Sequence, residues 1–198
     1  MPVHLAAEPS GTPEDTTIRY VIDTDASTFT ARAFATGLLA SFGHNPTISI
    51  PKMEGEISLN SEAVEQSSLR LTIHADGLAV ADDISEKDRN EINRKMHEEV
   101  LESNSYPNIV FSCSRGTASQ TGEGQYWMAL NGELSMHGVT RQQSVSARVA
   151  IQGDTIRATG DFAVLLSDYE IRPVSAVGGA VKLKDQIMLS FAISARKA

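Results

Sequence analysis

Residues 126–136, with the sequence YWMALNGELSM, carry apolar side chains at alternate positions. The apolar members of this set are Tyr126, Met128, Leu130, Leu134 and Met136. Because successive side chains of a β-strand point to opposite faces, this spacing predicts a strand that buries one face and exposes the other. The segment therefore indicates a sheet with a single apolar side.

The same alternation extends over most of the chain from residue 18 onward. It recurs at residues 18–22, 29–35, 53–59, 69–73, 109–113, 145–151, 156–164, 181–183 and 187–193. Turn signals such as Gly153-Asp154 separate these runs, which is typical of antiparallel strands joined by tight turns. A sheet of about eight or more strands closes into a barrel or splits into a sandwich, because long open edges invite aggregation. The predicted fold class is therefore mainly β.

Length and composition fit one globular domain. The chain has 198 residues, of which 41% are hydrophobic and 21% charged, and its net charge is −8. So acidic a chain repels phosphate backbones, and we expect no nucleic-acid partner. No apolar run approaches the ~20 residues that a membrane-spanning helix needs. The single cysteine, Cys113, excludes an internal disulfide and a CxxC zinc site.

The first residues differ in composition from the rest. Residues 1–17 contain three prolines and few large apolar side chains, which predicts a flexible N-terminal arm before a single domain at 18–198. The arm lacks the cationic start and apolar core of a secretory signal. The expected location is the cytoplasm, or the periplasm or cell exterior if a signal has been removed. A closed sheet has no open edge that would need to pair with a second copy of the chain, so the pattern predicts no particular oligomeric state.

Residues 82–103, DDISEKDRNEINRKMHEEVLES, break the two-residue period. Their apolar residues recur at multiples of four, namely Ile84, Ile92, Met96 and Val100. This spacing predicts an amphipathic helical insertion at about 85–102. Ser85, with Asp88 three residues later, resembles a capping box at the start of the helix. We expect the helix to form a lid across one mouth of a barrel, with a charge-rich docking face for a partner as the alternative.

Motifs for catalysis and metal binding are absent from the sequence. It contains no GxGxxG, GxxxxGK[ST], HExxH or GxSxG segment. No two of the five histidines stand at a metal-ligand spacing, and strand parity places His74 and His137 on the outer face. Cys113 falls on the apolar face, where a thiol more often acts as a small buried hydrophobe than as a nucleophile. We predict no catalytic residue, no metal site and no cofactor.

Two features indicate space inside the predicted sheet. The segment FATGLLASFGHNP at 34–46 places four large apolar side chains in a connection, where either the core or a ligand has to cover them. Small residues also stand on the apolar face, among them Ala31, Ala33 and Ala158. Because an eight-stranded barrel is just wide enough to be filled by side chains or to hold one small ligand, these alanines favour a cavity. A filled interior is the alternative.

Several longer segments resemble one protein family. The strand YPNIVF at 106–111, the strand and turn GELSMHGVT at 132–140 and the segment SDYEIRP at 167–173 are similar to the YceI-like proteins, also called polyisoprenoid-binding, lipocalin-like barrel proteins. The resemblance covers about residues 18–195. It implies an antiparallel eight-stranded barrel with a helical insertion, whose apolar interior holds a long-chain isoprenoid, quinone or related amphiphile. No reaction is implied.

The leading prediction is a non-enzymatic carrier that binds the tail of a long-chain amphiphilic lipid inside the barrel. The expected ligand-binding residues are Phe29, Ala33, Phe42, His44, Leu71, Ile73, Phe111, Met128, Leu130, Phe162, Leu189 and Phe191. Burial of a chain contributes about 0.8 kcal/mol per CH₂, and His44 or Arg32 would meet a polar head. Two alternatives are a filled barrel that serves as an accessory or stress-response interaction factor, and an enzyme or metal protein that uses His44.

Overall fold

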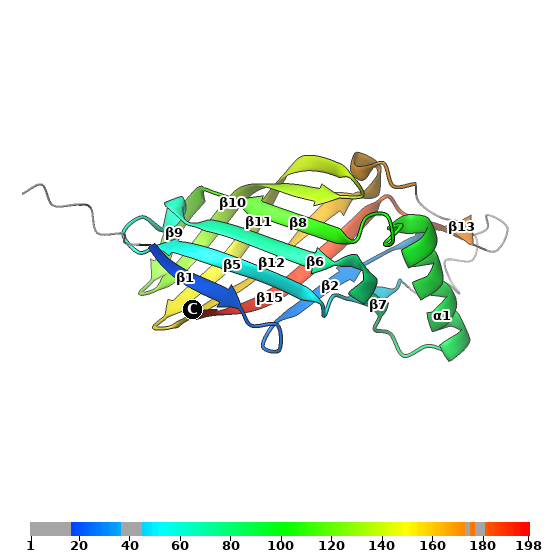
Figure 1. The fold of residues 1–198 in the computed structure, drawn as a ribbon, viewed down its shortest axis with the longest axis horizontal. Helices are drawn as coiled ribbons and strands as arrows, with labels where there is room; N and C mark the ends of the chain where they lie inside the picture. Colours follow the sequence, from blue (N-terminus) through cyan, green and yellow to red (C-terminus); the bar gives the residue numbers. More distant parts are fainter. Residues whose placement is uncertain (1–16, 37–44, 173–174, 177–180) are drawn as a thin grey trace, which may run out of the picture.

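A closed antiparallel barrel of eight strands forms the body of the protein (Figure 1). The computed structural model describes residues 17–36, 45–172, 175–176 and 181–198. In their order around the barrel, the strands are β1 (Thr17–Ile22), β5 (Met53–Asn60), β6 (Ser68–His74), β8 (Asn108–Cys113), β10 (Gln125–Met136), β11 (Val139–Gln152), β12 (Thr155–Leu165) and β15 (Gln186–Lys197). The last strand pairs with the first and closes the cylinder. The predicted eight-stranded barrel is confirmed.

Shorter strands extend the barrel wall at one end. They are β2 (Thr28–Arg32), β4 (Thr47–Ser49) and β7 (Ala79–Val80), which follow β15 in the order β2, β4, β7. The chain bends between β1 and β2 around Ser194 of β15, whose carbonyl accepts from Asp23 N at 2.9 Å and whose N–H donates to Ser27 Oγ at 3.0 Å. A small sheet of β3 (Ala35–Thr36), β14 (Val181–Leu183) and β13 (Ser175–Ala176) lies at the same end, and β9 (Gly116–Gly122) pairs with β10.

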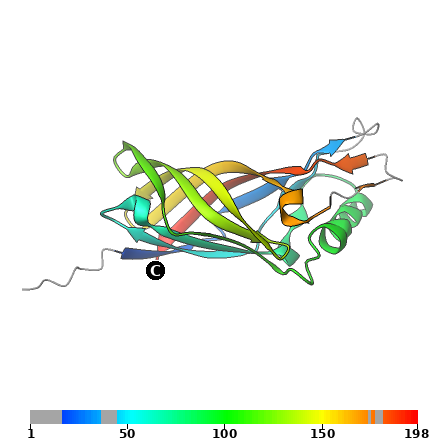
Figure 2. The same ribbon diagram turned by 90° about the horizontal axis from the view of Figure 1, so that it is seen from above.

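The helical insertion lies across the mouth at the extended end, as Figures 1 and 2 show. It consists of α1 (Glu86–Lys95) and the π-helical turn η3 (Met96–Val100), so the helix predicted at about 85–102 is confirmed. Ser85 caps its start, because its Oγ accepts from Asp88 N at 3.1 Å. The helix stops before Glu102, whose φ of 45° is left-handed. No helix within the described residues is long and apolar enough to cross a lipid bilayer.

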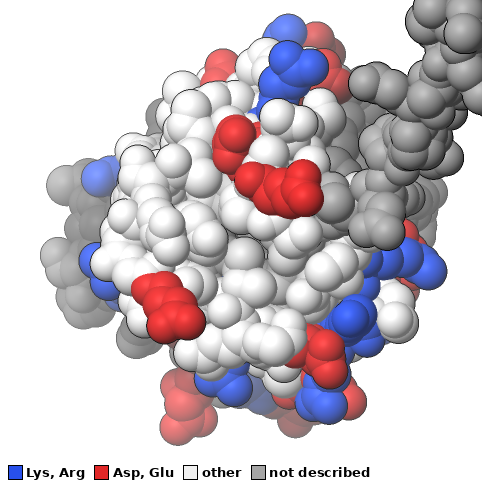
Figure 3. All heavy atoms as spheres, turned by 90° about the vertical axis from the view of Figure 1, so that its left-hand side faces the viewer, with Lys and Arg blue, Asp and Glu red and all other residues white. Residues whose placement is uncertain are grey.

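The opposite end of the barrel is closed by the short turn η1 (Val64–Gln66). The Val64 side chain is buried, with 8% of the residue exposed. Asn60 Oδ1 accepts from the N–H groups of Glu62 and Ala63, both at 3.0 Å, and Asn60 N donates to Ser67 Oγ at 3.0 Å. Figure 3, which faces this end, shows a surface of mostly uncharged residues with scattered charges of both signs.

The pairing register confirms the predicted inner face. Leu69, Leu71 and Ile73 of β6 lie opposite Cys113, Phe111 and Ile109 of β8, and all six line the barrel interior. The remaining short turns are η2 (Ala75–Gly77) and η4 (Leu166–Tyr169).

Two details differ from the sequence-based expectation. Thr17, assigned to the N-terminal arm, is the first residue of β1, and residues 1–16 lie outside the described residues. His137 stands in the turn between β10 and β11 with a φ of 53°, so strand parity does not determine the direction of its side chain. Its ring packs on that of Tyr106, with 4.3 Å between the ring centres.

Candidate functional site

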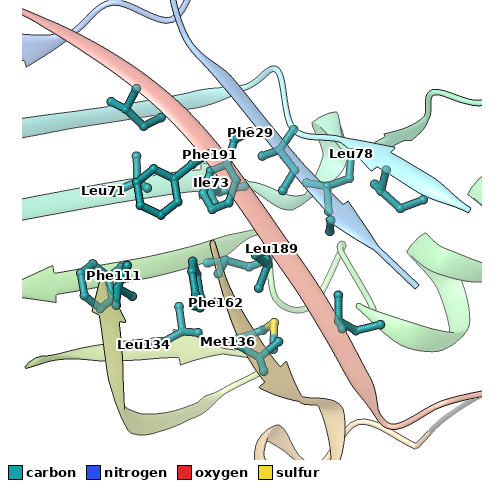
Figure 4. A pocket seen from close by; sticks show the side chains of 18 of the residues that line it. Phe29, Leu71, Ile73, Leu78, Phe111, Leu134, Met136, Phe162, Leu189 and Phe191 are labelled. Carbon is teal, nitrogen blue, oxygen red and sulfur yellow. The ribbon is translucent and has the colours of Figure 1, made fainter. Parts of the chain in front are cut away.

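A cavity of about 790 Å³ occupies the interior of the barrel. All eight barrel strands contribute lining residues, and most of these residues are aliphatic or aromatic. Figure 4 shows side chains from strands on both sides of the cavity, such as Phe29, Phe111 and Phe162, turned toward the same space. The volume lies within the range of about 300–1,000 Å³ that is typical of small-molecule sites.

The exposure of the inward-facing side chains shows directly that the barrel is hollow. Phe162 and Leu189 line the cavity and pack against the buried core, yet each is only partly buried. Their neighbours along the strands, Asp161 and Ser190, are exposed on the outer face. The accessible surface of the inward residues therefore belongs to the cavity. The alternative of a filled interior is wrong.

Three phenylalanine rings pack against one another in the wall of the cavity. Phe191 makes edge-to-face contacts with Phe29 and Phe162, with ring centres 6.0 Å and 6.4 Å apart. Gly160 pairs with Phe191 across β12 and β15, and a Cβ atom at residue 160 would stand 2.8 Å from the ring. The Phe191 ring therefore lies against β12, in the space that a side chain at residue 160 would fill. Because residue 160 is glycine, the ring does not have to extend further into the lumen.

Ten of the twelve residues expected to contact a ligand line this cavity. They are Phe29, Ala33, Leu71, Ile73, Phe111, Met128, Leu130, Phe162, Leu189 and Phe191. The other two, Phe42 and His44, fall outside the described residues. Arg32, expected near a polar head group, is exposed and is not part of the lining.

The sequence analysis missed the polar groups at the mouth beneath α1. Every charged residue of the lining falls between residues 82 and 95, namely Asp82, Asp83, Asp88, Glu91 and Lys95. The four-residue spacing of the apolar residues in this segment predicts an amphipathic helix, but it does not show which of the charged side chains face the cavity. A cluster of four acidic residues next to the predicted lid was the available signal.

Hydrogen bonds hold part of this acidic mouth in place. Asp82 Oδ2 accepts from the N–H of Thr47 at 2.7 Å, which ties the segment before α1 to β4. Glu91 accepts from Arg94 Nη2 at 3.1 Å and lies 3.6 Å from Lys95 Nζ. The hydrogen bond from Arg94 is the main cause that lowers the pKa of Glu91, so this carboxylate is charged at neutral pH.

The other end of the cavity carries no charge. Its polar lining residues are Ser67 and Ser68, which stand beside Val64 and Leu59. The cavity is therefore amphipathic along its length, with an uncharged closed end, an apolar middle and a charged mouth.

Groups suited to metal binding do not gather in the part of the chain that the structure describes. No cluster of three or more His, Cys, Asp and Glu side chains is found there. Cys113 is buried in the wall, where its thiol donates to the carbonyl of Arg115 at 2.9 Å. The imidazole of His74 is partly exposed on the outer face, 3.8 Å from Glu54.

Comparison with known proteins places the sequence and the fold in one group. The model of the YceI-like domain family matches residues 20–195. No curated protein matches the sequence closely enough to count as a relative.

Solved structures with the same fold have distant sequences. BcnA from Burkholderia cenocepacia is 16% identical, with a TM-score of 0.65 over 87% of this chain and 98% of its own. A polyisoprenoid binding domain from Saccharophagus degradans, implicated in plant cell wall breakdown, is 11% identical, with a TM-score of 0.65 over 91% and 99%. The YCEI protein of Campylobacter jejuni is 14% identical, with a TM-score of 0.54 over 76% and 84%. At these identities the likeness concerns the fold.

Proposed function

The chain belongs to the YceI-like domain family, and on that premise we propose that it binds a long-chain amphiphile, such as a polyisoprenoid or another lipid, inside the barrel without reacting with it. The observation that carries the proposal is the accessible apolar surface inside the barrel, on side chains such as Phe162 and Leu189. Covering this apolar surface with an apolar ligand removes it from water, which makes the free energy of binding favourable. The similar Saccharophagus degradans domain, described as polyisoprenoid binding, supports the same ligand class.

The shape of the cavity favours a chain over a compact ligand. Its lining extends from Ser67 and Ser68 at the closed end to Ile92 and Lys95 at the mouth, while its wall is apolar throughout the middle. Each buried CH₂ contributes about 0.8 kcal/mol, which corresponds to a roughly fourfold gain in affinity. Affinity should therefore rise with chain length until the cavity is full.

The direct test is to identify what the purified protein carries and what it binds. Organic extraction followed by mass spectrometry should release a long-chain lipid. Displacement of the fluorescent probe N-phenyl-1-naphthylamine should show affinities that rise from geraniol to farnesol to geranylgeraniol. If the extract contains no lipid and none of the three alcohols displaces the probe, the proposal is wrong.

A pair of variants separates the interior of the barrel from its surface. Ala31 lines the cavity on β2, so Ala31→Phe should fill part of the lumen and weaken farnesol binding at least tenfold. Ala192 is exposed on the neighbouring strand β15, and Ala192→Phe adds the same side chain outside the barrel. Equal binding by both variants would place the ligand somewhere other than the cavity.

A further inference from the structure

The charged lining residues all stand at one mouth of the cavity, and their charges affect which ligand head group can bind there. Asp82, Asp83 and Asp88 precede or begin α1, while Glu91 and Lys95 lie further along it. The closed end offers two serine side chains and no charge. Moving a polar head group from water into the apolar middle of the barrel is unfavourable, so the head group has to stay at an end. The mouth beneath α1 has the groups that can meet it.

The balance of charge at this mouth is negative. Four carboxylates and one ammonium group line it, and the Lys95 ammonium is already 3.6 Å from Glu91. The Asp83 side chain is exposed and has no hydrogen-bond or ion-pair partner among the described residues. A ligand therefore meets more negative charge than positive charge when it enters.

Arginines near the mouth do not reverse this balance. Arg89 is absent from the lining, and its Nη2 donates to the backbone carbonyl of Asp82 at 3.0 Å. Arg94 is also absent from the lining and binds Glu91 and Glu98, the latter at 2.8 Å.

We propose that the cavity prefers an amphiphile with a cationic head group, such as a long-chain amine, over one that ends in a phosphate or a carboxylate. The inference rests on the proposed function, because it concerns the head of a ligand whose tail lies in the barrel. Carboxylates attract a cationic head group and repel an anionic one, and both effects weaken as salt is added. A neutral head group should fall between the two.

Three ligands with one tail test the preference. Farnesylamine, farnesol and farnesyl phosphate share a C15 chain, so differences among them report on the head group. Each is titrated against the protein with bound N-phenyl-1-naphthylamine at low salt and again in 0.5 M NaCl. Farnesylamine should bind about tenfold or more tightly than farnesyl phosphate at low salt. The ratio should shrink at high salt, since screening acts on the charge and not on the tail.

Matched variants locate the source of the preference. Asp83→Asn with Glu91→Gln removes two negative charges at the mouth and should reduce the amine-to-phosphate ratio at least threefold. Glu123→Gln with Asp154→Asn removes two charges from the exposed turns between β9 and β10 and between β11 and β12, at the opposite end of the barrel. This second double variant has the same net charge as the first and should keep the wild-type ratio.

The outcomes separate this inference from the proposed function. Equal affinity for all three ligands, or tighter binding of the phosphate, overturns the head-group preference while carriage stands. An unchanged ratio in the mouth variant overturns it as well, because the carboxylates would then have no part in the selection. If none of the ligands displaces the probe, carriage itself is wrong and the preference falls with it.

Discussion

The two ends of the barrel are closed in different ways. At one end, the three-residue turn η1 buries Val64 and is fixed by hydrogen bonds to Asn60 and Ser67. At the other end, none of the ten residues of α1 is buried, and the buried side chains of the insertion, Met96 and Leu101, come after it. Lifting α1 alone exposes less buried apolar surface to water than opening η1 does, because the buried side chains of the insertion follow α1. The end of the barrel beneath α1 is therefore the easier one to open, and we expect the proposed ligand to enter there.

The largest expected effect tests the buried anchor. Val64→Asp places a carboxylate in an apolar site and should reduce the free energy of unfolding by about 3 kcal/mol. Ile92, on α1, lines the mouth and is only partly buried, so Ile92→Asp should cost less, about 1 kcal/mol, since solvent at the mouth reaches the new charge. Urea denaturation of both variants gives the two values. Equal losses would show that the ends are held alike.

The next effect concerns where an obstruction is placed along the cavity. Ala33 follows β2 near the mouth, whereas Ala158 lies on β12 near the closed end. Ala33→Phe should weaken geraniol and geranylgeraniol alike, by about tenfold, because both have to pass the mouth. Ala158→Phe shortens the lumen, so it should weaken geranylgeraniol and leave geraniol unchanged. The opposite pattern in probe displacement would place the entrance at the η1 end.

A smaller effect distinguishes two buried tyrosines, one toward each end. Tyr20 Oη donates to the carbonyl of Gly153 at 3.2 Å, and Tyr20→Phe should cost about 1 kcal/mol. Tyr169 is 1% exposed, and its hydroxyl has no hydrogen-bond partner among the described residues. Tyr169→Phe should therefore leave stability unchanged or raise it slightly. A loss of 1 kcal/mol on urea denaturation of the second variant would show that the Tyr169 hydroxyl does stabilise the fold.

The smallest effect is an acid-induced loosening of α1. The hydrogen bond from Arg94 holds the pKa of Glu91 below its ordinary value of 4.5, so the contact stabilises the helix above that pH and is lost as pH falls through the lowered pKa. Helical Cα chemical shifts over Glu86–Lys95 should decrease in this range while those of η1 stay constant. Glu91→Gln should remove the step. A step of equal size in this variant would assign the loosening to another group.

Strand periodicity predicted the barrel well because each strand has one apolar face. Leu69, Leu71 and Ile73 fall at a two-residue spacing, and the structure places all three in the lining. The helix was equally clear, since its apolar residues follow a four-residue spacing and Ser85 caps its start. Both features depend on neighbours along the sequence.

The chemistry of the mouth depends on contacts that local pattern does not encode. Asp82 faces the cavity because its carboxylate binds the N–H of Thr47, a residue 35 positions earlier. The bend around Ser194 likewise brings together segments 167 residues apart. Alanines on the inner face did indicate a cavity, but its charged mouth followed from long-range pairing.

Closure of the barrel also sets the order in which the protein can mature. Tyr20 of β1 pairs with Lys197 of β15, and the backbone N–H of Ala198 donates to Arg19 at 3.0 Å. A contact that spans this much sequence forms slowly and cannot form before residue 197 has been synthesised. The growing chain therefore has strands but no enclosed lumen. The lipid binding proposed above would therefore follow translation.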